Sequence, residues 1–320
     1  MLKVSILVPV YGVGPYIEQC AESLFLQTYP TIEFIFVNDC TQDDSIEKLK
    51  ACMARFPQQA AKVKIIHHHE NHGLGASRQT ALEAATGDAV TIVDSDDFLE
   101  PNAIALLVEK MVTSGADIVE GAYYRMGCKH EKIVLPAHTS KRRRTKTLLW
   151  HKGNGFIWGK LYRRDLFTQH DIKFTEGVDY GEDYSVLPRL LLVGSRTWID
   201  DVVYTYRCNR LNSYSTTQSL KSMISLAKAI KIVEAFFLRK DSQGIYRQAL
   251  HLGTLSMYAH AIKFHINRED LSQIDQIINY HPNGMLSRFL YWLFHVTYPS
   301  KVTRKFFCAI RRYYMYVHCW

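Results

Sequence analysis

Short apolar runs alternate with helical patterns along the first 120 residues. Continuous β-branched runs predict strands that are buried on both faces, as in a parallel sheet. They lie at Val4–Val8, Glu33–Val37, Val63–His67 and Ala89–Val93, with another near Asp117–Glu120. Apolar positions with helical spacing predict helices between them, at Tyr16–Gln27, Ser45–Met53, Gly75–Ala85 and from Pro101 onward. This alternation predicts an α/β domain, doubly wound, with a mostly parallel sheet.

The pattern changes in the remaining 200 residues. Around Gly127–Lys146 it becomes basic and irregular, and we expect the regular strand–helix repeats to end there. From Ser219 to about Ile278, helical apolar stripes predict two or three helices whose stripes form core. We therefore predict a first domain at 1–215, with its regular repeats at 1–120 and a less regular part at 121–215, followed by a helical region at 216–320.

The distribution of charge alters what the net charge suggests. The 320 residues contain 39 Lys and Arg and 31 Asp and Glu, a net of +8, which alone would suggest a nucleic-acid or anionic-membrane partner. Residues 1–120 carry 8 basic and 17 acidic side chains (8 − 17 = −9), and residues 121–320 carry 31 and 14 (31 − 14 = +17). The first part is therefore an acidic domain, and the basic character belongs to the rest.

The cysteines and the start of the chain indicate in which cellular compartment the protein is located. The seven cysteines are scattered, without metal-site spacing, and we expect them to be reduced, as in a cytosolic protein. The start of the chain resembles no signal peptide, because the apolar run at Val4–Val8 is short and Pro9 ends it. No window of about 18 residues is apolar enough for a spanning helix. We therefore expect a cytoplasmic location.

Polar side chains follow three of the predicted strands, at the edge where an open α/β sheet binds its ligands. Tyr11 follows the first strand, Asn38 and Asp39 the second, and Asp94-Ser-Asp-Asp97 the fourth. Closely spaced carboxylates repel each other unless a cation or protons compensate them. Mg²⁺ or Mn²⁺, bound by one or two carboxylates and by substrate phosphates, would do so. The alternative is a solvated acidic turn that precedes a helix.

Ordered motifs over roughly residues 3–215 resemble family 2 glycosyltransferases of the GT-A fold, whose nucleotide-binding half is Rossmann-like. The motifs are Pro9-Val-Tyr11, Glu33-Phe-Ile-Phe-Val-Asn-Asp39, Glu70-Asn71-His-Gly73, Ala76-Ser-Arg78, Val93-Asp-Ser-Asp-Asp97, Trp158-Gly-Lys-Leu-Tyr-Arg-Arg164, Gly181-Glu-Asp183 and Tyr204-Thr-Tyr-Arg207. The resemblance implies an inverting enzyme that transfers a sugar from a nucleoside-diphosphate donor, with UDP-hexose or UDP-N-acetylhexosamine favoured, to an acceptor hydroxyl.

The resemblance also implies roles for individual residues on the donor side. Asp96 would be the metal ligand, and Asp94 or Asp97 would contact the ribose or the donor sugar. Tyr11 would stack on the nucleobase, although it could be simple core. Arg78 would pair with a phosphate oxygen, although it could be an exposed helix charge. The predicted nucleotide-sugar-binding residues are Pro9, Tyr11, Asp39, Asn71, Gly73, Arg78, Asp94, Ser95 and Asp97.

On the acceptor side, inversion needs a carboxylate base on the face opposite the leaving group. The resemblance assigns this role to Asp183, with Glu182 positioning it, although the same residues could simply begin a helix. Trp158 could stack on a sugar ring, and Lys160 and Arg163 match the acceptor side. The chain departs from the family pattern at Asp39-Cys40-Thr41, where Asp-Gly-Ser is usual. Three consecutive histidines, 67–69, are interpreted as structural, because neighbouring residues on a strand face opposite ways.

The last 40 residues contain six Lys or Arg, no Asp or Glu, and eleven aromatic side chains. This composition is typical of an interfacial segment on an anionic membrane, where a lipid-linked or growing cell-surface glycan would be the acceptor. The alternative is a helix packed on the catalytic domain. Two other functions are alternatives: a sugar-phosphate nucleotidyltransferase, whose glycine-rich phosphate loop is missing between Val10 and Tyr16, and a non-enzymatic membrane- or nucleic-acid-binding module. We expect no nucleic-acid partner.

Overall fold

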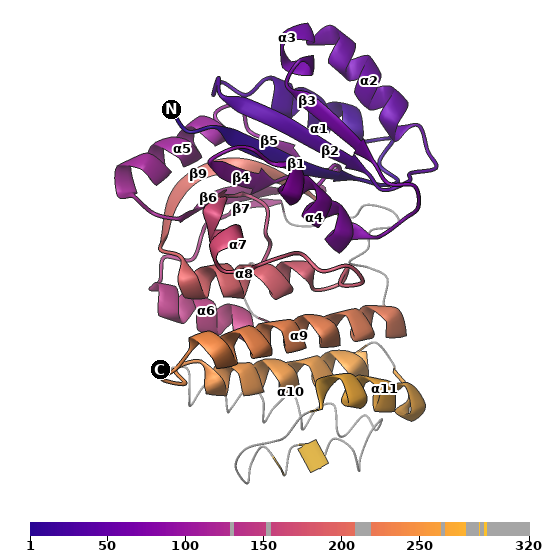
Figure 1. Cartoon of the computed structure of the whole chain (residues 1–320), viewed down its shortest axis with the longest axis vertical. Helices are drawn as coiled ribbons and strands as arrows, with labels where there is room; N and C mark the ends of the chain where they lie inside the picture. Colours follow the sequence, from indigo (N-terminus) through magenta and orange to yellow (C-terminus); the bar gives the residue numbers. More distant parts are fainter. Residues whose placement is uncertain are drawn as a thin grey trace. The chain divides into compact units, whose positions relative to one another are not determined.

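The computed structural model describes residues 1–128, 131–151, 155–208, 219–263, 266–279, 288 and 291–292. The chain forms two compact units (Figure 1). The first comprises residues 1–141, 156–179 and 190–211, and the second comprises 142–155, 180–189 and 212–320. The segments 142–155 and 180–189 thus belong to the second unit, whereas the predicted boundary at 215 assigned them to the first.

Four parallel strands form one half of the sheet in the first unit. Their order is β3 (Val63–His67), β2 (Ile32–Asn38), β1 (Val4–Val10) and β4 (Ala89–Ile92). Every residue of β1 and β4 is buried, which is why both strands are continuous apolar runs with little alternation. The predicted parallel core is confirmed.

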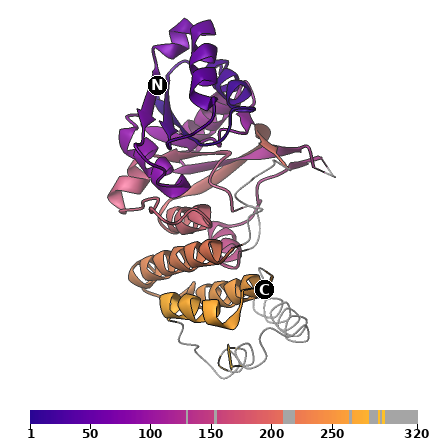
Figure 2. The ribbon, with the colours of Figure 1, turned by 90° about the vertical axis from the view of Figure 1, so that its right-hand side faces the viewer.

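The other half of the sheet is mixed, and its pairing was not predicted. It consists of β8 (Lys160–Arg163), β6 (Ile118–Met126), β9 (Arg196–Arg207), β5 (Phe98–Leu99) and β7 (Lys132–Val134). In this half only β6 and β9 pair in parallel; β8 runs antiparallel to β4 and β6, β5 to β9, and β7 to β6. Figure 2 shows β6 and β7 as a ribbon that extends beyond the rest of the sheet. Among the described residues the sheet has nine strands.

Helices cover both faces of the parallel half, as a doubly wound fold requires. The side chains of Val4, Ile6, Val8 and Val10 share one core with three helices. These helices are α1 (Ile17–Phe25), α2 (Ser45–Arg55) and α5 (Ala103–Ser114). The opposite face of β1 and β2 is packed by α4 (Leu74–Ala84). The short helices α3 (Pro57–Ala60) and α7 (Asp165–Gln169) lie in connections.

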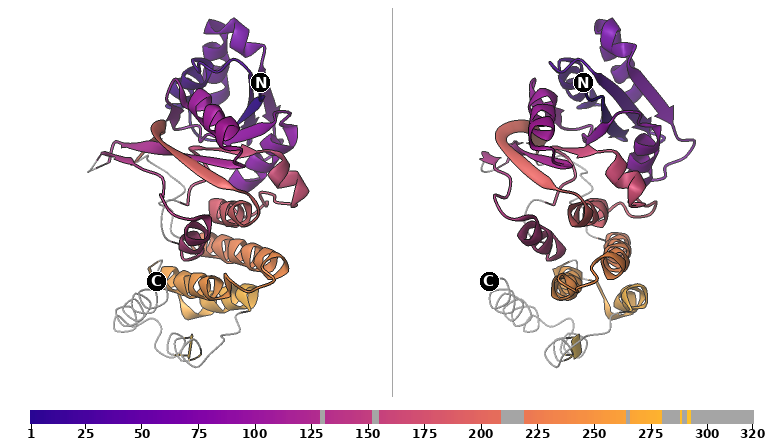
Figure 3. Two further views of the ribbon diagram at one scale, coloured as in Figure 1. Left: turned by 90° about the vertical axis from the view of Figure 1, so that its left-hand side faces the viewer. Right: turned by 60° about the vertical axis from the view of Figure 1, so that its left-hand side comes forward.

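The second unit is helical where it is described. Its long helices are α9 (Leu220–Lys240), α10 (Arg247–Lys263) and α11 (Arg268–Ile278), which confirms the predicted two or three helices. The right view of Figure 3 shows them side by side. No helix among the described residues has the length and apolarity needed to cross a membrane. Apart from Arg288, Tyr291 and Trp292, the basic aromatic tail lies outside the described residues.

The stretch predicted to be irregular contains a helix, α6 (Lys141–Leu149). Arg144 and Thr145 are buried, and so are Leu148 and Leu149 one turn later. Residues four apart share a helix face, so this spacing makes a buried stripe that the run of basic residues conceals in the sequence. The prediction of an irregular stretch is wrong here.

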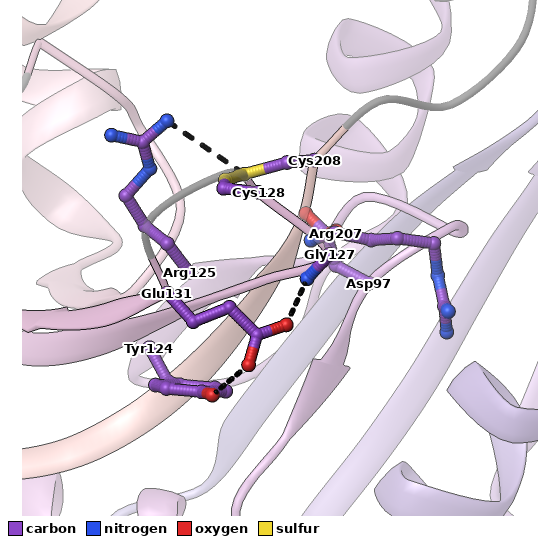
Figure 4. Close-up of a disulfide and its surroundings, with 8 residues drawn as sticks. All are labelled: Asp97, Tyr124, Arg125, Gly127, Cys128, Glu131, Arg207 and Cys208. Atoms are coloured by element: carbon purple, nitrogen blue, oxygen red, sulfur yellow. Dashed lines mark hydrogen bonds between the residues drawn. A yellow bond between two sulfur atoms is a disulfide. The ribbon is translucent and has the colours of Figure 1, made fainter.

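The prediction that all cysteines are reduced is also wrong. A disulfide joins Cys128 to Cys208, at the ends of the paired strands β6 and β9 (Figure 4). The amide of Cys208 donates to the carbonyl of Met126, which continues the pairing up to the two sulfurs. Strand pairing, rather than proximity along the chain, brings together two cysteines 80 residues apart.

Candidate functional site

The ends of three parallel strands meet at one edge of the sheet, as predicted. Val10 at the end of β1 pairs with Asn38 at the end of β2. The amide of Val93, just after β4, donates to the carbonyl of Leu7 at 2.9 Å. The polar clusters that follow these strands therefore lie side by side at the carboxyl edge.

The loop after β1 carries an exposed aromatic ring. The side chain of Tyr11 is 52% exposed, which excludes the interpretation that it is simple core. The loop is held from the β2 side, because the Gly12 amide donates to Thr41 Oγ1 at 2.9 Å and the Gly14 amide donates to Asp43 Oδ2 at 2.8 Å. Burial alone would raise the pKa of Asp43, but hydrogen bonds from Ser45, Gly14 and Thr41 lower it to about 2. Asp43 therefore anchors this loop as a carboxylate.

Cys40, which stands where the family pattern has glycine, adopts a backbone conformation that glycine favours. Its φ is +57°, in the left-handed region that favours glycine. The turn is stabilised by the amide of Thr41, which donates to Asn38 Oδ1 at 2.9 Å. The turn at Asp39-Cys40-Thr41 thus has the backbone conformation that glycine favours, although Cys40 stands there.

Asp39 organises the loop that leads from β3 to α4. It is 3% exposed, and its Oδ1 accepts from the His72 amide at 2.9 Å while its Oδ2 accepts from the Gly73 amide at 2.8 Å. The His68 ring lies between Asp39 Oδ1 (2.7 Å from Nδ1) and Thr80 Oγ1 (2.9 Å from Nε2). His68 is thus structural, as interpreted from the sequence. The nucleobase contact of Asp39 stays a prediction, because these bonds do not test it.

The N-terminal end of α4 is closed by a second carboxylate. Asp179 is buried, and its Oδ1 accepts from the amide of Gly75 at 3.1 Å. Gly73 has a φ of +89°, and a Cβ at this position would come within 2.3 Å of Asp179 Oδ1. Glycine is therefore required at 73 by both backbone and space. Asn71 is exposed beside it, and its Nδ2 reaches the carbonyl of Asp39 at 3.4 Å.

Arg78 is a buried cation at the acidic turn. It lies on α4, is 1% exposed, and its Nη2 contacts Asp94 Oδ1 at 2.6 Å. This burial excludes the interpretation of Arg78 as an exposed helix charge. A buried guanidinium is stable here because a carboxylate and its hydrogen bonds replace water. Its pairing with a donor phosphate stays a prediction.

Asp97 is the buried member of the acidic turn, and it belongs to a network that β9 provides. Its Oδ2 accepts from the Tyr204 hydroxyl at 2.8 Å, and its Oδ1 accepts from the amide of Arg207 at 2.7 Å. Burial, followed by the charges of Asp96 and Asp94, raises the pKa of Asp97 well above its usual value. Figure 4 shows Asp97 and Arg207 beside the disulfide. The turn therefore holds negative charge that the protein only partly compensates.

The acidic turn fits a divalent cation that arrives with a diphosphate. Ser95 is buried and Asp96 is half-buried. No group of three or more His, Cys, Asp or Glu within the described part of the chain is arranged to hold an ion. Mg²⁺ and Mn²⁺ commonly use one or two protein carboxylates and complete their shell with phosphate oxygens and water. The donor set thus suits a shared site and does not form a complete protein cage.

The three predicted acceptor-side residues are placed differently from that prediction. Trp158 is 2% exposed, and its ring stacks on those of Phe156 and Tyr204, both at 4.4 Å, so it offers no open face to a sugar in this structure. Lys160 is 5% exposed and donates to the Phe156 carbonyl at 2.7 Å. Arg163 pairs with Ala89 at the start of β4, at the end opposite the acidic turn.

Glu182 and Asp183 form the first turn of α8 (Glu182–Val193), so the expectation that they begin a helix is correct. Glu182 is buried and Asp183 is half-buried. Their segment belongs to the second unit, whereas the acidic turn belongs to the first. The role of Asp183 as general base therefore stays a prediction.

Sequence reasoning assigned no role to Tyr204 and Arg207, although it included them in a motif. Besides its amide bond to Asp97, Arg207 donates from Nε to the carbonyl of Asp96 at 2.9 Å and from Nη2 to Gln19 at 2.6 Å. Its guanidinium lies 5.0 Å from the centre of the Tyr16 ring. The available signal was the run Tyr204-Thr-Tyr-Arg207, which alternates large aromatic and polar residues; polar groups that become buried need hydrogen-bond partners.

A family model and a curated relative both indicate similarity to glycosyltransferases. The glycosyl transferase family 2 model matches residues 5–170. The uncharacterized glycosyltransferase EpsJ of Bacillus subtilis is 31% identical over 220 residues, which cover 64% of this chain and 61% of EpsJ. The chain thus spans less than two thirds of that relative.

Two solved structures share the fold at low identity. Staphylococcus aureus TarS 1–349 in complex with UDP-GlcNAc has a TM-score of 0.61, with 18% identity, and the match covers 86% of this chain and 84% of TarS. The mannosyltransferase PcManGT of Pyrobaculum calidifontis, in complex with GDP-Man and Mn²⁺, has a TM-score of 0.56 with 17% identity, covering 98% and 84%. The mixed α/β sheet described above is the GT-A fold. Because the family model matches more than half of its residues, this chain belongs to glycosyl transferase family 2.

Proposed function

We propose that this protein is an inverting, metal-dependent glycosyltransferase. It transfers a hexose or N-acetylhexosamine from a UDP-sugar to a hydroxyl group of a growing cell-surface glycan or a lipid-linked acceptor. The observation that carries the proposal is the acidic turn Asp94–Asp97 at the carboxyl edge of the parallel strands, where Asp94 pairs with the buried Arg78 and the charges of Asp96 and Asp94 raise the pKa of the buried Asp97. UDP-GlcNAc bound to TarS supports the class of donor.

The residues of the first unit would bind the donor as follows. The exposed ring of Tyr11 stacks on the nucleobase, and Asp39 accepts from the base edge. Asp96 ligates Mn²⁺ or Mg²⁺, and Asp94 or Asp97 contacts the ribose or the donor sugar. A cation held there would supply positive charge to the leaving diphosphate. Mn²⁺ in the PcManGT complex supports this choice of cofactor.

The acceptor hydroxyl must lose its proton as it attacks the anomeric carbon. Asp183 takes this proton, and Glu182 positions it. Attack from the face opposite the diphosphate inverts the anomeric centre. Family membership favours this function over a nucleotidyltransferase or a binding module without activity.

We also propose that the enzyme works at the cytoplasmic face of the membrane, where its basic aromatic tail contacts anionic lipid. The composition of residues 281–320 supports this proposal. Removing residues 285–320 should then shift the protein from the membrane to the soluble fraction of cells. An unchanged membrane fraction would refute the membrane contact and leave the glycosyltransferase assignment untouched.

A panel of UDP-, GDP- and dTDP-sugars, assayed for nucleoside diphosphate release with Mn²⁺, Mg²⁺ or EDTA, tests the enzymatic proposal. We expect release from a UDP-sugar that depends on the cation and falls about a thousandfold in Asp96→Asn. Asp183→Asn should lose transfer but keep donor binding, because only the base is removed. Turnover that persists in EDTA would refute metal dependence, and near-normal turnover in Asp183→Asn would refute the choice of base.

A further inference from the structure

Strand β9 holds the acidic turn from its far end. Directly after the turn, Phe98 and Leu99 form β5, which pairs antiparallel with β9 so that Leu99 lies opposite Tyr204. The backbone that leaves the turn is therefore fixed to the same strand that supplies the Tyr204 side chain. This strand comes from a part of the chain about 110 residues away.

The Tyr204 hydroxyl joins the two ends of the turn. It donates to Asp97 Oδ2 at 2.8 Å and accepts from the Asp94 amide at 3.2 Å. The turn itself is closed by the Asp97 amide, which donates to the Asp94 carbonyl at 3.0 Å. One hydroxyl thus connects both residues that flank Ser95 and Asp96.

The hydroxyl is itself held in place. Tyr204 is completely buried, and its ring stacks on Trp158 at 4.4 Å with an angle of 9° between the rings. Burial and the nearby Asp97 and Asp94 raise the pKa of Tyr204 well above its usual value, so the phenol stays protonated and can donate. Trp158 therefore has a structural role, because it packs against the Tyr204 ring whose hydroxyl contacts the Asp94–Asp97 turn.

We propose that Tyr204 is a positioning residue, whose hydroxyl sets the geometry of the Asp94–Asp97 turn so that Asp96 can bind a divalent cation together with a nucleoside diphosphate. This inference rests on the proposed function, because that function gives the turn its ligand. Without the hydroxyl, Asp97 loses one of its two hydrogen bonds and the Asp94 amide loses its acceptor. The turn would then be held mainly by β5 and Arg207.

Tyr204→Phe removes only the hydroxyl, and Tyr206→Phe is its matched control. Tyr206 lies two residues along the same strand and stacks on the same Trp158 at 5.3 Å. Among the described residues its hydroxyl has no hydrogen-bond partner. Both variants keep an aromatic ring in the cluster and should stay folded, with Tyr204→Phe the less stable of the two because it removes buried hydrogen bonds. Thermal unfolding of both variants shows whether either substitution prevents folding before their Mn²⁺ binding is compared.

The first measurement is binding of Mn²⁺ in the presence of UDP, followed by the electron paramagnetic resonance signal of free Mn²⁺. We expect Tyr204→Phe to bind Mn²⁺ about tenfold more weakly than wild type, as the loss of one charge-assisted hydrogen bond implies. Tyr206→Phe should stay within about twofold of wild type. Unchanged Mn²⁺ affinity in Tyr204→Phe, or an equal loss in both variants, would overturn the positioning role.

Amide hydrogen exchange over residues 93–98 gives a readout that needs no ligand. Exchange in this segment should be faster in Tyr204→Phe than in Tyr206→Phe, because the Asp94 amide has lost its acceptor. If wild type binds no Mn²⁺ with UDP, the proposed function is wrong, whatever the exchange shows. If wild type binds it and exchange over 93–98 is the same in both variants, only the positioning role is wrong.

Discussion

Carboxylates lie at both ends of the parallel strands, and folding shifts the pKa values of Glu33 and Asp97 in opposite directions. At the amino end, Glu33 on β2 accepts from Ser5 Oγ at 2.6 Å and the Thr86 amide at 2.7 Å, and it contacts Lys3 Nζ at 2.7 Å. Burial alone would raise the pKa of Glu33, but hydrogen bonds from Lys3, Ser5 and Thr86 lower it to about 2. At the carboxyl end, burial and two neighbouring carboxylates raise the pKa of Asp97.

The opposite pKa shifts reflect different charge balances at the two ends of the strands. The amino-end carboxylate has a donor for each of its oxygens and a cation beside it, so it stabilises the fold. At the carboxyl end Arg78 pairs with Asp94, but the charges of Asp94 and Asp96 still raise the pKa of the buried Asp97, so part of the repulsion remains in the folded state. Groups with such perturbed pKa values concentrate at functional sites, where a ligand can complete the charge balance. Glu33 and Asp97 therefore differ in the charge balance around them, although both are carboxylates.

The largest expected effect is loss of the cation at the carboxyl end. Arg78→Met should lower the free energy of unfolding by about 3 kcal/mol, because it leaves Asp94 without its buried partner. Arg55→Met is the control, since its contact with Glu18 is open to solvent and should contribute much less to the free energy of unfolding. Urea denaturation measures both. In a double-mutant cycle, Asp94→Asn should recover part of the loss; strict additivity would show that the pair is not coupled.

A smaller loss is expected at the amino end. Glu33→Gln should lower the free energy of unfolding by about 2 kcal/mol at pH 7. The folded-state pKa of Glu33 is below its unfolded value, so its contribution is complete above about pH 4.5 and disappears as the pH falls toward about 2. Urea denaturation as a function of pH measures this, with the exposed Glu109→Gln as control. If Glu33→Gln and wild type lose stability in parallel between pH 5 and 3, the pairing of Glu33 contributes nothing.

The smallest effect has the opposite sign. Asp97→Asn should raise the free energy of unfolding by about 1 kcal/mol at pH 8, because it removes a buried charge beside Asp94 and Asp96. The folded-state pKa of Asp97 is above its unfolded value, so wild-type stability falls as the pH rises from about 4 through that raised pKa. The stability of Asp97→Asn should not decrease over this pH range on account of residue 97, which no longer ionises. The comparison between Glu33 and Asp97 would break down if Asp97→Asn were as destabilising as Glu33→Gln.

Much of the candidate site could be predicted because its signals are local. The runs that form β1, β2 and β4 place Tyr11, Asp39 and Asp94 just after strand ends, and parallel strands bring such ends to one edge. The resemblance to a family then supplied the chemistry of those positions. Buried strands can be recognised in the sequence because a strand that is covered on both faces must be apolar throughout.

Other features depended on partners far along the chain. The sequence contains Trp158 and Tyr204, but only the packing of β8 and β9 shows that Trp158 is core and that Tyr204 bonds to Asp97. The Cys128–Cys208 disulfide and the helix at 141–149 were missed for related reasons. In the first case the pairing of β6 with β9 decides the contact, and in the second a buried stripe is hidden by basic residues.

The sequence alone therefore determined the parallel half of the sheet, the strand-end positions of the donor-side residues and the helical character of the C-terminal region. The tertiary structure decided which of these side chains are exposed, which charges are compensated and which strand supports the acidic turn. The physical reason is the range of the interactions. Hydrophobic periodicity acts between residues a few positions apart, whereas burial and the pKa of a carboxylate depend on every group that folding brings near it.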